Sequence, residues 1–269
     1  MHILRRSLSW IAAVAALLLT VDGFVAMSPA SAETTATPCR NASDIVRLSN
    51  PLSRVSAKLA SGQPITIVAL GSSSTAGAGA SSPAASYPNR LAADLVKRFP
   101  KHPIRVVNRG VNGEEARDML ARFDESVASE RPDLVLWQVG TNAVLRDQPL
   151  AAQDTLIHDG IARMKALGAD VVLIDPQFAP KVIAKTDAPR MVALIAAAAK
   201  KENVDLFQRF ALMQRWQADD KIPFETFVSA DGLHMNDWSY GCFASNLASA
   251  IAEAATRPVA TVSATASFH

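Results

Sequence analysis

Short apolar runs alternate with amphipathic stretches along the central part of the chain. The amphipathic stretches have the apolar spacing of helices and cover Asn89–Phe99, Glu114–Ser129, Leu150–Leu167 and Ala188–Glu202. The apolar runs are rich in Val, Ile and Leu and cover Ile65–Leu70, Ile104–Asn108, Leu134–Val139, Val171–Asp175 and Val204–Phe207. Strands that are almost continuously apolar are typical of a parallel sheet buried by helices on both faces. The pattern therefore predicts an α/β protein built as a three-layer α/β/α sandwich.

The two ends of the chain depart from this alternation. Residues 1–32 have a positively charged start, a nearly unbroken apolar run over Trp10–Leu19 and small residues up to Ala32, which is typical of a signal peptide. The run is shorter than the ~20 residues of a membrane span, so we expect cleavage near Ala32 and a secreted or periplasmic mature chain without stable membrane insertion. An uncleaved membrane anchor is the alternative. The rest divides into an N-terminal segment with the first helix, the α/β domain and a flexible C-terminal tail, at residues 33–62, 63–256 and 257–269.

The charge of the chain is nearly balanced, with 27 Lys and Arg residues against 25 Asp and Glu residues and a formal net charge of +2. Proteins that bind nucleic acids concentrate positive charge, so this balance gives no reason to expect such a partner. Hydrophobic residues make up 49% of the chain, which is enough for a substantial core. We therefore expect a globular protein with a pocket.

The chain has two cysteines, Cys39 and Cys242, too few for a disulfide-rich scaffold or a Cys-rich zinc site. In an oxidising compartment they can form a disulfide between the N-terminal segment and a C-terminal helix. Two separate thiols are the alternative, because a sequence does not establish that two Cα atoms are close enough to be bridged.

Polar segments follow the first three apolar runs, at the edge where parallel sheets bind their ligands. Ser73 lies in Gly71–Gly77, where a glycine-bounded turn can expose a nucleophilic hydroxyl. A flexible loop or a phosphate cradle is the alternative, although the P-loop lysine is missing. Gly113 ends the segment Asn108–Gly113 and can turn a backbone N–H toward the cleft, or simply form a turn. Asn142 can donate its amide to an oxyanion or cap the next helix.

One histidine has a carboxylate at a spacing that suits chemistry. His234 follows Asp231 by three residues, so the carboxylate can orient the imidazole ring. The other histidines after residue 32 lie in polar surroundings or at the terminus: His102, His158 and His269. The pair alone is also compatible with a surface turn or half of a metal site. The sequence holds no second cluster of ligands, so we expect no metal.

Together, these four segments resemble the SGNH hydrolases, the GDSL esterase and lipase superfamily. The resemblance spans about Ile65 to Ala250 and keeps the family order of motifs. It implies a catalytic triad and an oxyanion hole, formed by Ser73, Asp231 and His234 and by Ser73, Gly113 and Asn142, respectively. It also implies a flavodoxin-like sheet with strand order 2-1-3-4-5.

One position departs from the family pattern. Ser72 stands where the family has an Asp before the nucleophile. This residue is not a member of the triad, so we expect the change to affect the pocket rather than the chemistry.

The resemblance implies a serine ester hydrolase that cleaves short acyl esters, acetyl esters above all, through an acyl-serine intermediate and without a cofactor. The substrate would be a small-molecule or saccharide ester. An O-acyltransferase acting on envelope saccharides, a lipase or lysophospholipase, and a non-catalytic glycan-binding domain are the alternatives. Gln177 follows the fourth apolar run and Trp238 follows the histidine, so both can line the pocket; core packing and helix capping are the alternatives. The sequence does not determine the oligomeric state.

Overall fold

Five parallel strands form the central sheet, and each lies on one of the predicted apolar runs. The computed structural model describes residues 37–258, so the expected signal peptide and nearly all of the expected tail lie outside the described residues. The order across the sheet, β2-β1-β3-β4-β5, confirms the flavodoxin-like arrangement. The strands are β1 (Ile65–Gly71), β2 (Ile104–Gly110), β3 (Leu134–Gln138), β4 (Asp170–Ile174) and β5 (Asp205–Phe207).

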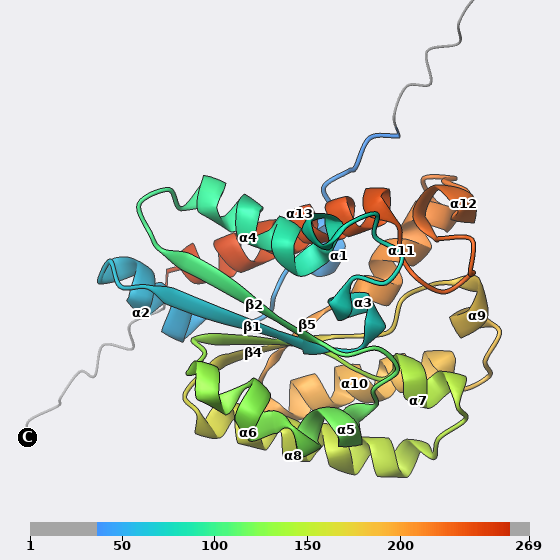
Figure 1. Cartoon of the computed structure of the whole chain (residues 1–269), viewed down its shortest axis with the longest axis horizontal. Coiled ribbons are helices and arrows are strands. Elements are labelled where there is room, and N and C mark those ends of the chain that lie inside the picture. The colour runs from blue at the N-terminus through green and yellow to red at the C-terminus, as the bar shows by residue number, and fades with distance from the viewer. Residues whose placement is uncertain (1–36, 259–269) are drawn as a thin grey trace, which may run out of the picture. The chain divides into compact units, whose positions relative to one another are not determined.

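Helices cover both faces of the sheet, which confirms the three-layer sandwich. In Figure 1, α4 (Tyr87–Arg98) and α13 (Asp237–Thr256) lie on one face, and α5 (Ala116–Ala121), α6 (Phe123–Ser126), α8 (Leu150–Ala166) and α10 (Ala188–Glu202) lie on the other. The remaining helical elements are α1 (Ser43–Val46), α2 (Ser53–Ala60), α3 (Ser73–Ala76), η1 (Pro83–Ala85), η2 (Ala128–Glu130), α7 (Thr141–Leu145), α9 (Pro180–Ile183), α11 (Arg209–Ala218) and α12 (Phe224–Phe227).

The helix predicted over Glu114–Ser129 is divided into α5, α6 and η2. Arg122 interrupts it, because its backbone leaves the helical conformation at φ −104° and ψ 17°. Its guanidinium reaches back to the Glu114 carboxylate and to the carbonyl oxygen of Arg109. The apolar spacing therefore identified the buried face correctly, but the ion pair at Arg122 shortened the helix.

The burial of the strands follows from their place in the sheet. Every residue of β3 is buried, because β1 and β4 flank it and helices cover both of its faces. In the edge strand β2, Arg105 is exposed and every other residue is partly exposed. The core is therefore centred on β1, β3 and β4, and the carboxyl ends of β1 and β3 are fixed by packing on all sides.

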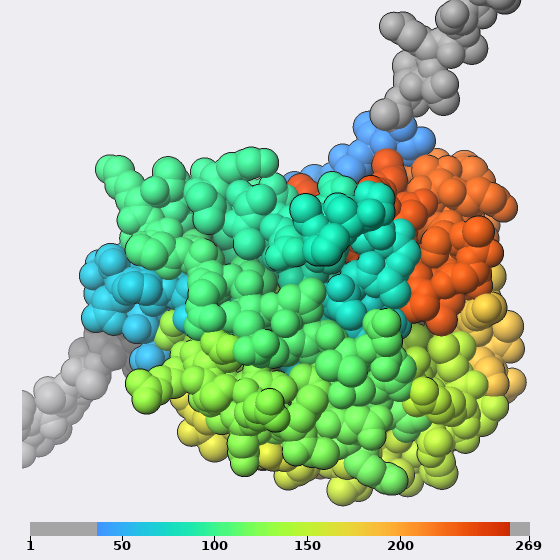
Figure 2. All heavy atoms as spheres, in the orientation of Figure 1, coloured from blue at the N-terminus to red at the C-terminus, as the bar shows by residue number. Residues whose placement is uncertain are grey.

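The strand order places a topological switch point where β1 and β3 end. β2 pairs with one side of β1, and β3 then adds to the other side of β1. The connections after these strands run to opposite faces, and ligands bind at such switch points in open α/β sheets. Figure 2 shows the teal segment after β1 meeting the orange segment that precedes α13 on the surface. The contact is close, because a Cβ placed on Gly79 would lie 3.0 Å from the Cβ of His234.

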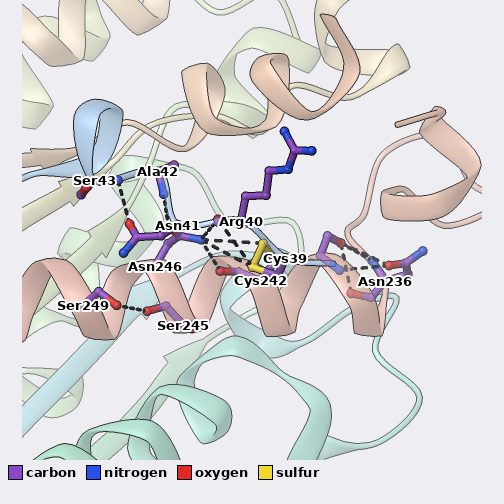
Figure 3. The surroundings of a disulfide bond; sticks show 11 residues. Cys39, Arg40, Asn41, Ala42, Ser43, Asn236, Cys242, Ser245, Asn246 and Ser249 are labelled. Carbon is purple, nitrogen blue, oxygen red and sulfur yellow. Dashed lines mark hydrogen bonds between the residues drawn. A yellow bond between two sulfur atoms is a disulfide. The ribbon is translucent and has the colours of Figure 1, made fainter. Parts of the chain in front are cut away.

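A disulfide joins the two ends of the described chain. Cys39 precedes α1 and Cys242 lies in α13, with their Cα atoms 5.3 Å apart (Figure 3). The amide nitrogen of Asn246 donates to the carbonyl oxygens of Arg40 and Cys242, and its oxygen accepts from the backbone N–H of Ala42 at 2.9 Å. The N-terminal segment is thus held against α13 by a covalent bond and by one buried amide.

Past α13, Arg257 is anchored on the same side of the domain as the N-terminal segment. Its guanidinium donates to the carbonyl oxygens of Leu48 and Ser49 and pairs with Glu253. The last turn of α13 is therefore tied to the segment between α1 and α2. Within residues 37–258, none of the helices has the length and apolar character that a membrane crossing requires.

We expect the disulfide to contribute much of the thermal stability. It spans 203 residues of sequence, and closing so long a loop removes chain entropy from the unfolded state worth up to about 5 kcal/mol. Replacing both cysteines, Cys39→Ser with Cys242→Ser, should therefore lower the Tm by roughly 10 °C or more, as measured by calorimetry. A reducing agent should lower the Tm of the wild-type protein similarly and leave that of the double variant unchanged. A fully reduced wild-type protein with an unchanged Tm would contradict this.

Candidate active site

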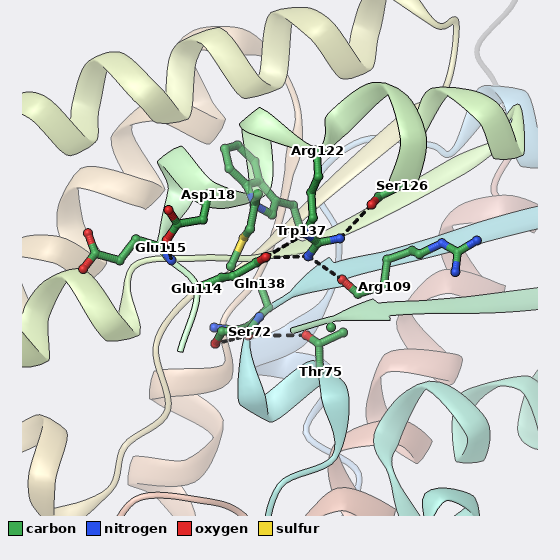
Figure 4. A network of polar contacts seen from close by, with 12 residues as sticks. Ser72, Thr75, Arg109, Glu114, Glu115, Asp118, Arg122, Ser126, Trp137 and Gln138 are labelled. Carbon is green, nitrogen blue, oxygen red and sulfur yellow. Dashed lines mark hydrogen bonds and ion pairs between the residues drawn. The ribbon is translucent and has the colours of Figure 1, made fainter. Parts of the chain in front are cut away.

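The turn after β1 places Ser73 at the carboxyl end of the sheet. Gly71 is required there, because a Cβ at this position would lie 2.1 Å from Thr75 Oγ1. The next residue, Ser72, is buried, and both its backbone N–H and its hydroxyl donate to Gln138 Oε1, at 2.9 and 3.0 Å (Figure 4). Ser73 follows as the first residue of α3 and is partly exposed. The hydroxyl that departs from the family pattern thus anchors the turn internally rather than shaping an open pocket.

Three of the predicted site residues form one hydrogen-bonded chain. His234 Nε2 lies 2.8 Å from Ser73 Oγ, and His234 Nδ1 lies 2.5 Å from Asp231 Oδ2. An ionised carboxylate only accepts, so Nδ1 carries the proton and Nε2 is left to accept the serine hydroxyl. The geometry is that of a nucleophile, a general base and an orienting carboxylate.

Asp231 is held in its ionised form. Burial opposes ionisation, but hydrogen bonds from the His234 ring and from the backbone N–H groups of His234 and Leu233 outweigh it and keep the pKa of Asp231 well below its usual range. The Ser229 hydroxyl adds a further hydrogen bond at 3.0 Å. The carboxylate is therefore charged at neutral pH and orients the imidazole ring.

The loop that carries the histidine is supported from two sides. Ser229 donates its backbone N–H to the carbonyl oxygen of His234 at 2.8 Å, and its hydroxyl, which donates to Asp231, also lies 2.9 Å from this oxygen. On the other side, Gly79 approaches so closely that a Cβ there would lie 2.3 Å from the carbonyl oxygen of Met235. Asn236 then caps α13 by accepting from the backbone N–H of Ser239. The support residues Ser229 and Gly79 were not predicted, because their role depends on contacts that local spacing does not reveal.

The structure brings Gly113 and Asn142 to the same end of the sheet. Gly113 has a φ of +78°, which favours glycine, and its carbonyl oxygen accepts from Arg146 at 2.8 Å. Asn142 lies on α7 and donates from its side-chain amide to the carbonyl oxygen of Glu114 at 2.7 Å. This contact uses one of the two hydrogens of the Asn142 amide, so the other hydrogen can be donated to a ligand. Asn142 does not cap α7; Gly140 occupies the N-cap position.

The Gly113 segment is tied both to α3 and to an ion pair. Asn108 donates to the carbonyl oxygen of Thr75 in α3 at 2.8 Å, and a Cβ on Gly110 would lie 2.1 Å from the backbone nitrogen of Ala76. Figure 4 shows Arg122 in contact with the side-chain carboxylate of Glu114. The backbone carbonyl oxygen of Glu114 accepts the hydrogen bond from the Asn142 amide. The serine turn and the Gly113 segment are therefore packed as one unit.

The two predicted pocket residues differ in position. Gln177 is only 1% exposed and its side chain is bonded to neighbouring protein groups, so it does not line an open pocket. Core packing, the alternative, describes it correctly, because the chain after β4 turns inward. Trp238 is partly exposed at the start of α13 and packs edge-on against Trp216 with ring centroids 5.1 Å apart. It remains a predicted substrate contact.

A cavity of about 310 Å³ lies beside the loop that carries Asp231 and His234. Its wall is mainly apolar and includes Pro180 of α9 and Phe224 of α12, together with Ser229 and Gly232 of the loop. Within residues 37–258, no three His, Cys, Asp or Glu side chains are grouped so that they could hold a metal ion. The contacts among Ser73, His234 and Asp231 offer a hydroxyl, an imidazole and a carboxylate for chemistry.

The chain belongs to the non-GDSL lipase-like family, whose model matches residues 38–257. This membership confirms the resemblance to SGNH hydrolases. The absence of an Asp at position 72 agrees with the non-GDSL designation.

The individual relatives either match a short part of this chain or share about a fifth of its residues. An acetylxylan esterase from Geobacillus stearothermophilus is 42% identical over 52 residues, which cover 19% of this chain and 24% of the relative. A two-domain esterase active on acetylated mannans has a TM-score of 0.67 at 19% identity, over 81% of this chain and 58% of its own. A variant of an acetyl xylan esterase from Geobacillus stearothermophilus has a TM-score of 0.59 at 20% identity, over 70% and 94%. These structural likenesses show a shared fold, and the chain spans about a quarter of the curated relative it matches.

Proposed function

We propose that the protein is an exported serine esterase that removes short acyl groups, acetyl above all, from saccharide esters. The observation that carries this proposal is the hydrogen-bonded chain from Ser73 through His234 to Asp231 at the carboxyl end of a parallel sheet. Activity on acetylated xylan and mannan is named for the relatives and supports the acetyl and saccharide parts of the proposal. The signal-peptide pattern in residues 1–32 supports export, and the mature chain would begin at Glu33.

The reaction follows the acyl-serine route. Ser73 Oγ attacks the ester carbonyl carbon while His234 Nε2 takes the hydroxyl proton, and the tetrahedral intermediate collapses as His234 returns this proton to the departing alcohol. Water then attacks the acyl-serine, His234 again acts as the base, and the carboxylic acid leaves with Ser73 restored. Asp231 stabilises the imidazolium during both halves.

The negative charge that develops on the carbonyl oxygen needs donors that are already in place. The backbone N–H groups of Ser73 and Gly113 and the free amide hydrogen of Asn142 supply them in this proposal. Their fixed position costs little reorganisation during the reaction, because Glu114 and Arg146 hold the Gly113 segment and Asn142.

The exposure of the site suits a large alcohol component. The side chain of Asp231 is 44% exposed and that of His234 is 17% exposed, so the triad lies near the surface rather than in a deep tunnel. A saccharide that carries an ester can approach such a site with most of its chain in solvent. A long acyl chain, by contrast, gains affinity only where an apolar channel covers it, at ~0.8 kcal/mol per CH₂ group.

Ser73→Ala should abolish hydrolysis. Removal of the nucleophile is expected to lower kcat on p-nitrophenyl acetate by up to roughly 10⁶, as in other serine hydrolases. The matched control is Ser74→Ala, one residue further along α3, which should retain activity within a few-fold of the wild-type protein. Near-normal turnover by purified, folded Ser73→Ala would contradict the proposed function.

Asn142→Ala should lower kcat by about 10²–10³ with little change in KM, because the amide acts mainly on the transition-state oxyanion. The control is Asn112→Ala, an exposed asparagine beside Gly113, for which steady-state kinetics should be unchanged. Thermal unfolding of both variants shows whether the loss of the hydrogen bond from Asn142 to Glu114 has destabilised the fold. A loss confined to KM would indicate ground-state binding instead.

The acyl profile distinguishes the esterase from a lipase. With p-nitrophenyl esters, kcat/KM should be highest for acetyl to butyryl groups and fall for chains of about eight carbons or more, because a site that fits a short acyl group excludes a longer one. Acetylated xylan or mannan should release acetate in the same preparation, as measured by an enzymatic acetate assay. A profile that rises steadily to palmitoyl esters would show a lipid cleft and contradict the saccharide ester proposal.

A further inference from the structure

A buried glutamine lies behind the site and contacts both halves of it. Gln177 Oε1 accepts from the Thr141 hydroxyl at 2.9 Å, and Gln177 Nε2 donates to the carbonyl oxygen of Leu233 at 3.2 Å. Thr141 immediately precedes Asn142, and Leu233 immediately precedes His234. One side chain, from the segment after β4, therefore bridges the segment of the proposed oxyanion donor and the loop of the proposed base.

The orientation of this amide is determined by its neighbours. Arg209 Nη2 lies 3.0 Å from Gln177 Oε1, and a guanidinium can only donate, so the oxygen must face it. The carbonyl oxygen of Leu233 can only accept, so the nitrogen must face the loop. A flip of the amide would place two donors together on one side and two acceptors together on the other. The bridge thus has one stable arrangement.

Arg209 is itself rigidly held. It is 0% exposed, and its Nε donates to the carbonyl oxygen of Asp175 at 2.9 Å. Burial lowers the pKa of Arg209 to about 10, so the guanidinium remains protonated at neutral pH and makes a charge-assisted hydrogen bond to Gln177. The Asp175 side chain is also buried and accepts from the backbone N–H of Phe210 at 2.8 Å. The bridge is therefore anchored to the ends of β4 and β5 rather than to a surface loop.

We infer that Gln177 is a positioning residue, which holds the Asn142 segment and the His234 loop at the spacing that the reaction needs. This inference rests on the proposed function. Ester attack requires the oxyanion donor and the base to be aligned with the same carbonyl group, and a displacement of about 1 Å can cost up to 10²-fold in rate. Gln177 sets this spacing without touching the substrate, because its side chain is enclosed behind both segments.

The first test is Gln177→Leu, which removes the contacts with Thr141 and Leu233 together with the one from Arg209, and keeps a side chain of similar size. We expect kcat on p-nitrophenyl acetate to fall by roughly 10- to 100-fold while KM changes little, because alignment rather than substrate binding is lost. The matched control is Gln153→Leu, a glutamine on α8 that is 3% exposed, which should keep the wild-type kcat. Both variants are compared at a temperature well below their measured Tm values.

A second pair of variants does not disturb Arg209. Thr141→Val removes one hydroxyl from the bridge with almost no change in shape, and Thr141→Ser restores it. We expect kcat to fall several-fold in Thr141→Val and to recover in Thr141→Ser, again at constant KM. In the double variant with Gln177→Leu, the valine should add little further loss, because the bridge is already broken. This pair decides the question if Gln177→Leu does not fold.

Wild-type kcat in folded Gln177→Leu, or an equal loss in Gln153→Leu, would overturn the inference. So would equal kcat values for Thr141→Val and Thr141→Ser. These results differ from failure of the proposed function, in which the wild-type protein itself lacks Ser73-dependent esterase activity. The wild-type protein and Ser73→Ala are therefore measured in the same series.

Discussion

The hydrogen bond between Ser73 and His234 joins residues that are 161 positions apart, and the rest of the fold makes this contact possible. The sheet fixes the serine turn, because β1 is buried between two strands and two layers of helices. The histidine lies on a loop before α13, and this loop has no strand of the sheet to hold it. Its position depends on close approach to Gly79 and on the hydrogen bonds of Ser229.

Buried amides replace regular secondary structure at the carboxyl ends of the strands. Gln138, the last residue of β3, accepts hydrogen bonds from the backbone N–H and the hydroxyl of Ser72 and thereby supports the turn that carries Ser73. Gln177, after β4, supports the segments of Asn142 and His234. An amide can accept and donate at once, so a single side chain can join two segments that share no backbone hydrogen bonds. Gln177 is bonded at both of its polar atoms, and a buried polar group costs little when it is bonded and specifies one arrangement of the loops.

The disulfide acts at a different level. It ties the segment before α1 to the first half of α13, the helix that begins directly after the histidine loop. Asn246 joins the segment before α1 to the same helix, and Arg257, directly after the helix, binds the segment between α1 and α2. The N-terminal segment thus restrains the long helix from outside the sheet, and an oxidising compartment would favour this bond.

The sequence alone determined the layers, the strand positions and the residues of the proposed site. The apolar runs indicate which segments are buried in the sheet. The polar residues directly after these runs lie at one edge of a parallel sheet, which identified Ser73 and Asn142 as candidates. Asp231 and His234 are only three residues apart, so their pairing could also be predicted from the sequence. The tertiary structure decided the break at Arg122, the inward turn of Gln177 and the support that Gly79 and Ser229 give to the histidine loop. Periodicity shows that a side chain is buried, but the partner of a buried polar group comes from a distant segment, and only the packing of the whole chain selects it.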